Sequence, residues 1–246
     1  MKNLLKLFLA TLIMLLISCN NDSSEEIILD SSAEEIENFE GEFDAKEFES
    51  MEKSGRKYFV ISREEAFNPI LNEVSGKSTL IRGRRGIWAR YKAKKLIPGH
   101  AYTLWWVIWN KPENCTTPNQ CNDGDFPNAA NVEVELLYAS GAVAKRNGKV
   151  TFYSRLRAGN DSGSVNDLFG LPFFGGLQKG NTFGSEVHLV IRSHGPAIPG
   201  LVNEQIGGYL GGCPQSFPYG FAPFTEIPDA VGECGDIEFS IHAPVN

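Results

Sequence analysis

The chain has 246 residues, of which 42% are hydrophobic and 11% aromatic, and its formal net charge is −7. This length and apolar content suit a single domain with a buried core, and they exclude a wholly disordered chain and a multi-span membrane protein. The charge excludes a strongly basic nucleic-acid binder, so we expect no nucleic-acid partner. Residues 20–50 contain twelve acidic side chains and one basic side chain, Lys46, and the rest of the chain is close to neutral.

Residues 1–18 have the pattern of a secretory signal peptide. Two early lysines precede an apolar run over 7–17, which is shorter than the roughly 20 residues of a membrane-spanning helix. The run ends in Leu16-Ile17-Ser18-Cys19, which resembles the lipobox of bacterial lipoproteins. The resemblance implies cleavage before Cys19 and acylation of Cys19, which would anchor the protein to a membrane. An ordinary signal peptide followed by an incidental cysteine is the alternative.

Residues 19–54 are expected to form the lipidated cysteine and an acidic, flexible tether. The segment is rich in Glu, Asp, Ser and Asn, which cannot bury enough apolar surface to fold. The alternative is an acidic helix with one apolar face, formed by Ile36, Phe39, Phe43, Phe48 and Met51. In composition, an acidic run after a lipidated cysteine resembles signals that some Gram-negative groups use for surface lipoproteins. We therefore expect the protein in the outer membrane or on the cell surface of a Gram-negative-type bacterium.

Residues 55–246 are predicted to form an all-β domain. Apolar residues alternate with polar ones, or run together as in a buried strand, over 87–93, 101–110, 132–138, 142–145, 150–157, 187–191 and 237–241. Asn147-Gly148 between two of these segments predicts a β-hairpin. Residues 201–210 are the best helix candidate.

The segment Leu96–Tyr102 suggests a topology. It fits the pattern L-x-P-G-x-x-Y, which resembles the tyrosine corner of Greek-key sandwiches. There the tyrosine hydroxyl bonds to backbone a few residues upstream as the chain passes between sheets. We therefore predict a Greek-key β-sandwich of about 7–9 strands with long loops.

The five cysteines predict disulfides rather than a metal site. If Cys19 carries lipid, four cysteines remain, and they allow three connectivities. The favoured one is Cys115–Cys121, which closes a short loop, with Cys213–Cys234, which links a glycine-rich segment to the last strand. A four-cysteine metal site is the alternative, but neither pair has the C-x-x-C spacing that zinc favours, and an oxidising compartment favours disulfides.

One predicted strand has a polar face that contains Glu186, His188 and Arg192. His188 and His194 lie about 20 Å apart along an extended strand, too far to share a metal ion. We expect these histidines to be hydrogen-bonded structural residues. The alternative is a metal-assisted enzyme in which Glu186, His188 and Arg192 meet His242 across neighbouring strands.

Two oxygen-rich loops are weak candidates for calcium binding. Asp123 and Asp125 lie in one loop and Asp161 in the other, and each loop offers two or three of the six to eight oxygens that calcium requires. Turns in which Asn and Asp side chains accept bonds from local backbone amides are the favoured interpretation. We expect no cofactor, with calcium as the less favoured alternative.

Aromatic residues supply the ligand-binding candidates. Trp105 and Trp109 share one face of their strand, and they are either core or a platform for a sugar ring. Phe169, Phe173 and Phe174 lie in a glycine-rich loop, where they either cover the end of the sandwich or form an exposed binding patch. The basic cluster Arg82-Gly83-Arg84-Arg85 is predicted to be a solvated turn rather than a nucleic-acid site.

Four stretches, 96–110, 115–121, 186–213 and 232–242, together resemble a group of uncharacterised secreted bacterial proteins. The resemblance covers residues 75–244 and implies no activity or catalytic residues. Hydrolase, metalloprotease and phosphate-loop motifs are absent from the sequence. We therefore expect a non-catalytic module that binds a glycan, a peptide or an envelope protein, with the enzyme centred on Glu186, His188 and His242 as the alternative.

Overall fold

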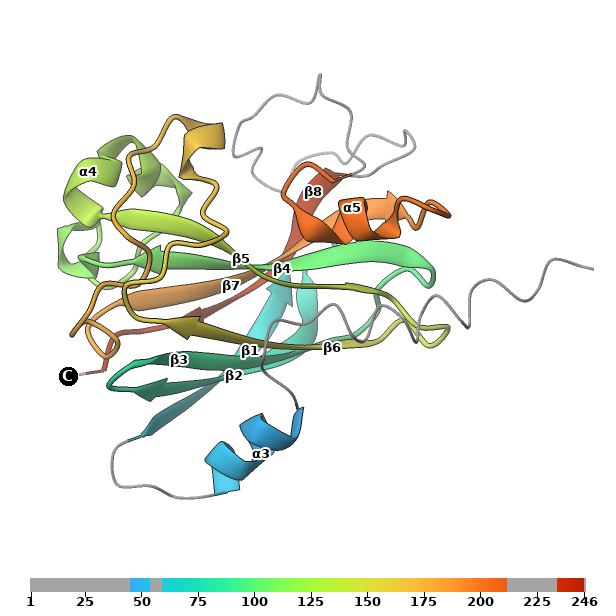
Figure 1. The fold of residues 1–246 in the computed structure, drawn as a ribbon, viewed down its shortest axis with the longest axis horizontal. Helices are drawn as coiled ribbons and strands as arrows, with labels where there is room; N and C mark the ends of the chain where they lie inside the picture. Colours follow the sequence, from blue (N-terminus) through green and yellow to red (C-terminus); the bar gives the residue numbers. More distant parts are fainter. Residues whose placement is uncertain (1–44, 54–58, 212–233, 246) are drawn as a thin grey trace, which may run out of the picture. The chain divides into compact units, whose positions relative to one another are not determined.

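The computed structural model describes residues 45–53, 59–211 and 234–245, and most of them lie in β-strands or in the loops between them (Figure 1). The strands are β1 Val60–Asn68, β2 Glu73–Gly83, β3 Gly86–Ala93, β4 His100–Trp109, β5 Val134–Val143, β6 Val150–Arg157, β7 Glu186–Pro196 and β8 Cys234–His242. The helices are α3 Ala45–Lys53, α4 Ala129–Val132 and α5 Val202–Gly207, with 3-10 turns at Pro112–Asn114, Asp123–Asn128 and Asn166–Phe169. None of the described helices is long and apolar enough to cross a membrane.

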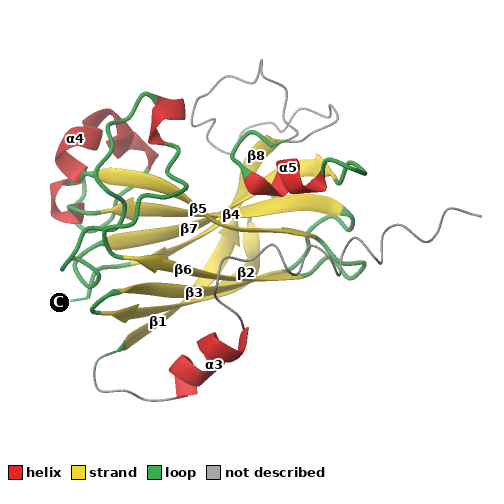
Figure 2. Ribbon diagram, in the orientation of Figure 1, coloured by secondary structure: helices red, strands yellow, loops and turns green. Residues whose placement is uncertain are grey.

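The eight strands form one antiparallel sheet in the order β5-β4-β7-β8-β1-β2-β3-β6, which is nearly closed into a barrel. The β class and the number of strands are as predicted. The prediction of a sandwich of two sheets is corrected, because every strand has a hydrogen-bonded neighbour within the single sheet and the sheet packs against itself by curling. The short helices lie outside it (Figure 2).

The core fills the inside of the curled sheet. On β4 it receives Leu104, Trp106 and Ile108, and on β7 it receives Val187, Leu189 and Ile191. The alternate residues of both strands point to the outer face, where loops cover them. This double burial explains why residues 101–110 are buried at every position and mostly apolar, as expected for a central strand.

The tyrosine corner is confirmed. The backbone N–H of Ile97 donates to the hydroxyl oxygen of Tyr102 at 3.1 Å, and Gly99 has a φ of +76°. A positive φ is readily adopted by glycine and rarely by other residues. The corner joins β3 to β4, which are not neighbours in the sheet, so it carries the chain from one half of the sheet to the other.

The turn predicted at Asn147-Gly148 is present, but its hairpin is not. The N–H of Gly148 donates to the carbonyl of Lys145 at 2.9 Å, and of the two turn residues only Gly148 has a positive φ. A type I′ hairpin turn would need positive φ at both. β5 pairs with β4 and β6 pairs with β3, so the turn connects the two edges of the sheet across the place where it does not close.

Helix α3 occupies the last part of the segment that was expected to be a flexible tether. Phe48 is fully buried and packs in a small cluster with Ile81 of β2 and Trp88 of β3. Met51 packs against the same cluster, so these two residues agree with the alternative of an amphipathic helix. The other residues of that expected apolar face, Ile36, Phe39 and Phe43, and the acylation site Cys19 lie outside the described residues.

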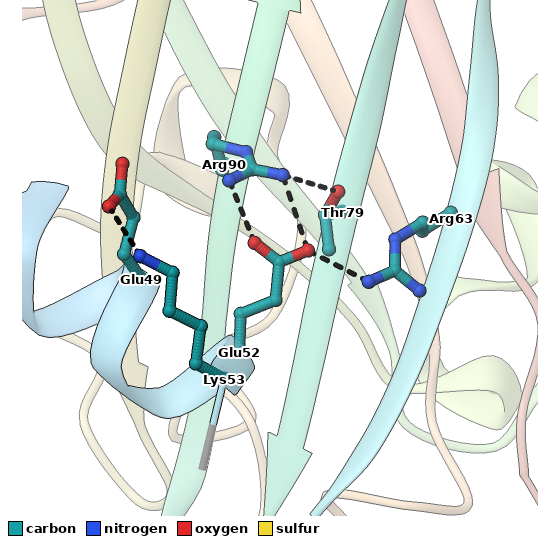
Figure 3. Close-up of polar contacts among 6 residues, drawn as sticks. All are labelled: Glu49, Glu52, Lys53, Arg63, Thr79 and Arg90. Carbon is teal, nitrogen blue, oxygen red and sulfur yellow. Dashed lines mark hydrogen bonds and ion pairs between the residues drawn. The ribbon is translucent and has the colours of Figure 1, made fainter. Parts of the chain in front are cut away.

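Glu52 attaches α3 to the sheet (Figure 3). Its carboxylate accepts a bond from Arg63 of β1 at 2.8 Å and another from Arg90 of β3 at 2.8 Å. The Arg90 guanidinium also lies over the ring of Phe48, 5.0 Å from its centroid. Partial burial would raise the pKa of Glu52, but the bonds and charges of the two arginines outweigh it and lower the pKa.

We expect Glu52→Gln to lower the free energy of unfolding by about 1 kcal/mol at pH 7, because a networked ion pair on a partly exposed surface has about that value. Because the folded-state pKa of Glu52 is lowered, its contribution is present above the unfolded-state pKa and is lost as the pH falls through the folded-state pKa. Urea titrations of both proteins at pH 7 and at acidic pH measure this difference. The control is Glu49→Gln on the same helix, because the ion pair of Glu49 within the described part of the chain is with the exposed Lys53 at 3.3 Å. Equal losses in the two variants would contradict the prediction.

Candidate functional site

The outer face of β4 and β7 forms the floor of a partly enclosed pocket. Its volume is about 590 Å³ with the open mouth included. Loops, β5 and the start of β8 supply the walls. The lining residues are Trp105, Val107, Trp109, Asp123, Phe126, Leu136, His188, Val190, Tyr209 and Asp236.

Aromatic rings dominate the pocket walls. Trp105 packs edge-on against Tyr209 with ring centroids 5.1 Å apart, and Trp109 packs against Phe126 at 5.0 Å. Trp105 and Trp109 are only 2% and 1% exposed. The favoured interpretation of these tryptophans as core residues is therefore confirmed by their burial, and the same residues also line the pocket.

His188 is held at the pocket floor by Glu186. The two side chains approach within 2.7 Å, Nε2 to Oε1, and Glu186 is completely buried. The same Oε1 accepts the backbone N–H of Cys121 at 2.9 Å, so the loop closed by the Cys115–Cys121 disulfide fixes the carboxylate. The other oxygen, Oε2, is buried with no hydrogen-bond partner among the described residues.

The Cys115–Cys121 disulfide is confirmed, with its Cα atoms 5.3 Å apart. The second expected bridge, Cys213–Cys234, lies outside the described residues, which include neither Cys213 nor the side chain of Cys234. It stays a prediction.

Arg192 joins the pocket wall to Asp236. A register shift between Ile191 and Arg192 places Arg192 opposite Asp236 of β8. Its guanidinium lies 3.9 Å from the ring centroid of Tyr209 and 3.1 Å from the Asp236 carboxylate. The Tyr209 hydroxyl donates to the same carboxylate at 3.2 Å. Burial and then the charge of Asp236 raise the pKa of Tyr209, so the phenol stays protonated and can donate.

Asp123 is the second carboxylate of the pocket. Burial of its carboxyl group, and next the negative charge of Asp236, raise the pKa of Asp123, while His188 acts in the opposite direction. The two carboxylates therefore lie close enough to repel each other. Because both carry negative charge when ionised, the pocket favours a positively charged group over an anion.

The predicted meeting of His242 with His188 and Glu186 is wrong. In the β7–β8 register His242 is opposite Val187, so it faces the interior, whereas His188 is opposite Ile241 and faces outward. The ring of His242 is hydrogen-bonded to Ser62 Oγ at 2.7 Å and to Ser78 Oγ at 2.8 Å. Burial, followed by the charges of Arg82 and His188, lowers its pKa to about 3. It is a hydrogen-bonded structural histidine.

His194 is structural in the same way. Its ring is hydrogen-bonded to Thr103 Oγ1 at 2.7 Å and to the carbonyl of Gly211 at 2.8 Å. Burial, together with the nearby Arg192 charge, lowers its pKa to about 3.

Of the three loop phenylalanines, Phe169 lies beside the pocket and the other two do not line it. The Phe169 ring packs against Tyr209 at 5.0 Å. Phe173 is 55% exposed, and Phe174 is fixed through its backbone N–H, which donates to Glu135 at 2.7 Å. The glycine-rich loop therefore combines the two alternatives, because Phe169 is packed against Tyr209 and Phe173 is exposed.

The oxygen-rich loops act as turns. Asp125 accepts the N–H groups of Thr116 at 2.7 Å and Asn122 at 3.0 Å, and Asn160 accepts that of Ser162 at 3.1 Å. Asp161 lies in an exposed part of the second loop. In the described part of the chain, no three His, Cys, Asp or Glu side chains gather as metal ligands.

Sequence reasoning missed Phe126, Leu136, Tyr209 and Asp236. Tyr209 lies in residues 201–210, which the sequence marks as a helix candidate and not as part of a site. Asp236 follows an irregularity in the β7–β8 pairing that alternation does not reveal. A lone aromatic residue among glycines was the one signal that pointed to Tyr209.

Comparison of the chain with protein-family models and with curated proteins found no match.

Proposed function

We propose that this chain is a lipid-anchored lipoprotein of the bacterial cell envelope whose sheet domain is a non-catalytic binding module. The lipobox-like sequence before Cys19 supports the anchor, and the outer membrane or cell surface is the proposed location. The pocket over Trp105 and Trp109 is the proposed binding site. Its partner is a glycan, a peptide or an envelope protein that inserts one group into it.

The observation that carries this proposal is the convergence of four aromatic side chains and two carboxylates on one partly enclosed pocket. Pockets that bind ligands combine an apolar lining with a few polar groups that fix orientation.

The alternative of a metal-assisted enzyme has less support. His242 lies on the other face of the sheet, and Arg192 is engaged by Tyr209 and Asp236. Only Glu186 and His188 remain together from that expected group.

The test is to fill the pocket. Val190 lies on the pocket floor and is partly buried, so we expect Val190→Trp to abolish binding of any glycan or peptide that the full chain captures from an array. The matched control is Val74→Trp at a position on β2 that is 47% exposed and does not line the pocket. Thermal unfolding of both variants checks that they fold. Unchanged binding by a folded Val190→Trp variant would exclude the pocket as the site.

A further inference from the structure

We infer that the pocket over Trp105 and Trp109 binds an organic ammonium group, presented by a small molecule or by a side chain. The inference rests on the proposed function, because it names the ligand chemistry of the same site. It draws on three separate features of the pocket, which are its aromatic lining, its balance of charge and the way it already holds the cation of Arg192.

The lining suits a cation. Trp105, Trp109, Phe126 and Tyr209 line the pocket. The negative face of an aromatic ring attracts a cation, and several rings around one cavity form the usual site for an ammonium group. The indole N–H of Trp105 is already used, because it donates to Thr103 Oγ1 at 2.7 Å. The indole donor of Trp105 is therefore not available to a ligand.

The charges at the pocket also favour a cation. Asp123 and Asp236 line it, and the buried carboxylate of Glu186 lies directly behind His188. Two arginines balance two of these carboxylates, because Arg192 contacts Asp236 at 3.1 Å and the charge of the buried Arg82 acts on Glu186. The negative charge that remains is that of Asp123, which lines the pocket and can attract a cation.

Arg192 shows how this wall recognises a cation. Its guanidinium lies 3.9 Å from the Tyr209 ring centroid and at the same time contacts the Asp236 carboxylate. A ligand ammonium group between the pocket rings and Asp123 would make the same two kinds of contact. It would also relieve the repulsion between Asp123 and Asp236.

A stacked neutral sugar fits less well. Trp105 and Trp109 are 2% and 1% exposed, so neither presents a broad open face on which a sugar ring could lie. An anion would face two carboxylates. A compact cationic group meets neither difficulty.

The experiment is a titration calorimetry comparison on the full chain purified in detergent, with two pairs of probes. Choline is compared with its uncharged isostere 3,3-dimethylbutan-1-ol, and Nα-acetyl-lysine methylamide with Nα-acetyl-norleucine methylamide. We expect at least one cationic probe to bind about tenfold or more tightly than its neutral partner. A difference within the choline pair identifies a quaternary ammonium as the group that the pocket binds. A difference within the lysine pair identifies a primary ammonium.

Three variants locate the effect. Asp123→Asn is expected to weaken the cationic probe about fivefold, because it removes one carboxylate charge from the pocket. Asp161→Asn removes the same charge from an exposed loop outside the pocket and is expected to leave the affinity unchanged. Val190→Trp is expected to abolish binding of the probe.

Three results would overturn the inference. They are equal binding of a cation and its neutral isostere, no binding of either cationic probe at millimolar concentration, and equal effects of Asp123→Asn and Asp161→Asn. If an array ligand without a cation binds the full chain but not the Val190→Trp variant, the binding-module proposal stands and the ammonium inference fails. If array ligands and probes bind equally well to the Val190→Trp variant, both fail.

Discussion

Replacing Arg82 by methionine is expected to lower the free energy of unfolding by about 3–5 kcal/mol, because three backbone carbonyls lose hydrogen bonds from a buried charged donor. Arg82 is completely buried inside the sheet. Its guanidinium donates to the carbonyls of Thr182 at 2.8 Å and of His242 and Ala243 at 3.1 Å each. Methionine has a similar length but no donor, so these carbonyls would lose their bonds and Glu186 would lose a compensating charge.

The electrostatic surroundings of Arg82 support this size of effect. Burial lowers the pKa of Arg82 to about 10, and the charge of Glu186 acts in the opposite direction. Urea unfolding at pH 7, followed by circular dichroism, measures the loss. Arg85→Met, at an exposed position three residues further along, is the matched control, and we expect it to change stability by less than about 0.5 kcal/mol. Similar stabilities for the two variants would show that the buried bonds of Arg82 contribute little.

Glu238→Gln is expected to stabilise the protein at and above neutral pH by up to about 3 kcal/mol. Glu238 is completely buried, and burial raises its pKa to about 7, while the neighbouring Ser75 and Tyr91 hydroxyls act in the opposite direction. Oε2 accepts a bond from Ser75 Oγ, whereas Oε1 is buried without a hydrogen-bond partner in the described part of the chain. Ionising this carboxyl therefore disfavours folding.

The pH dependence of this effect has a definite sign. Because the pKa is raised in the folded state, the folded protein holds its proton more tightly than the unfolded chain does. The stability of the wild type relative to Glu238→Gln is therefore greatest below about pH 4.5, falls as the pH rises to about 7, and is constant above that. Melting curves of both proteins across this range measure the difference. Glu65→Gln, at an exposed site on β1, is the control and should show no such trend. A difference between wild type and Glu238→Gln that does not change with pH would contradict the prediction.

The strands could be predicted from the sequence because alternation and apolar runs are local signals. The segments expected at 87–93, 101–110 and 187–191 correspond to β3, β4 and β7. The single sheet could not be predicted, because strand order depends on pairings between distant segments. β7 lies between β4 and β8, and β1 is next to β8, at the other end of the domain sequence. No local pattern encodes these neighbours.

The candidate site was predicted only in part, because alternation locates residues on a strand but does not show how the strands pair. Trp105, Trp109 and His188 were identified because each lies on a strand with a clear pattern. His242 was misplaced because one residue of register decides which face a side chain occupies. Arg82 was expected in a solvated turn with Arg84 and Arg85, but alternation along β2 places it inside with Leu80. The turn begins only after Gly83.

The junction between β1 and β8 differs from the other junctions of the sheet. Within the described residues these strands share one paired position, Phe67 with Phe239, whereas β7 and β8 pair along most of their length. At this junction, side chains connect the two halves of the sheet in place of a backbone ladder. Ser62 and Ser78 bind His242, Ser75 binds Glu238, and Arg82 binds the carbonyls at the end of β8.

A junction made by side chains can be weakened or strengthened one residue at a time, which a backbone ladder does not allow. We therefore expect the β1–β8 junction to open first when the domain opens, with β1, β2, β3 and β6 in one unit and β4, β5, β7 and β8 in the other. The aromatic pocket lies entirely on the second unit and its loops, so it can stay assembled when the two units separate.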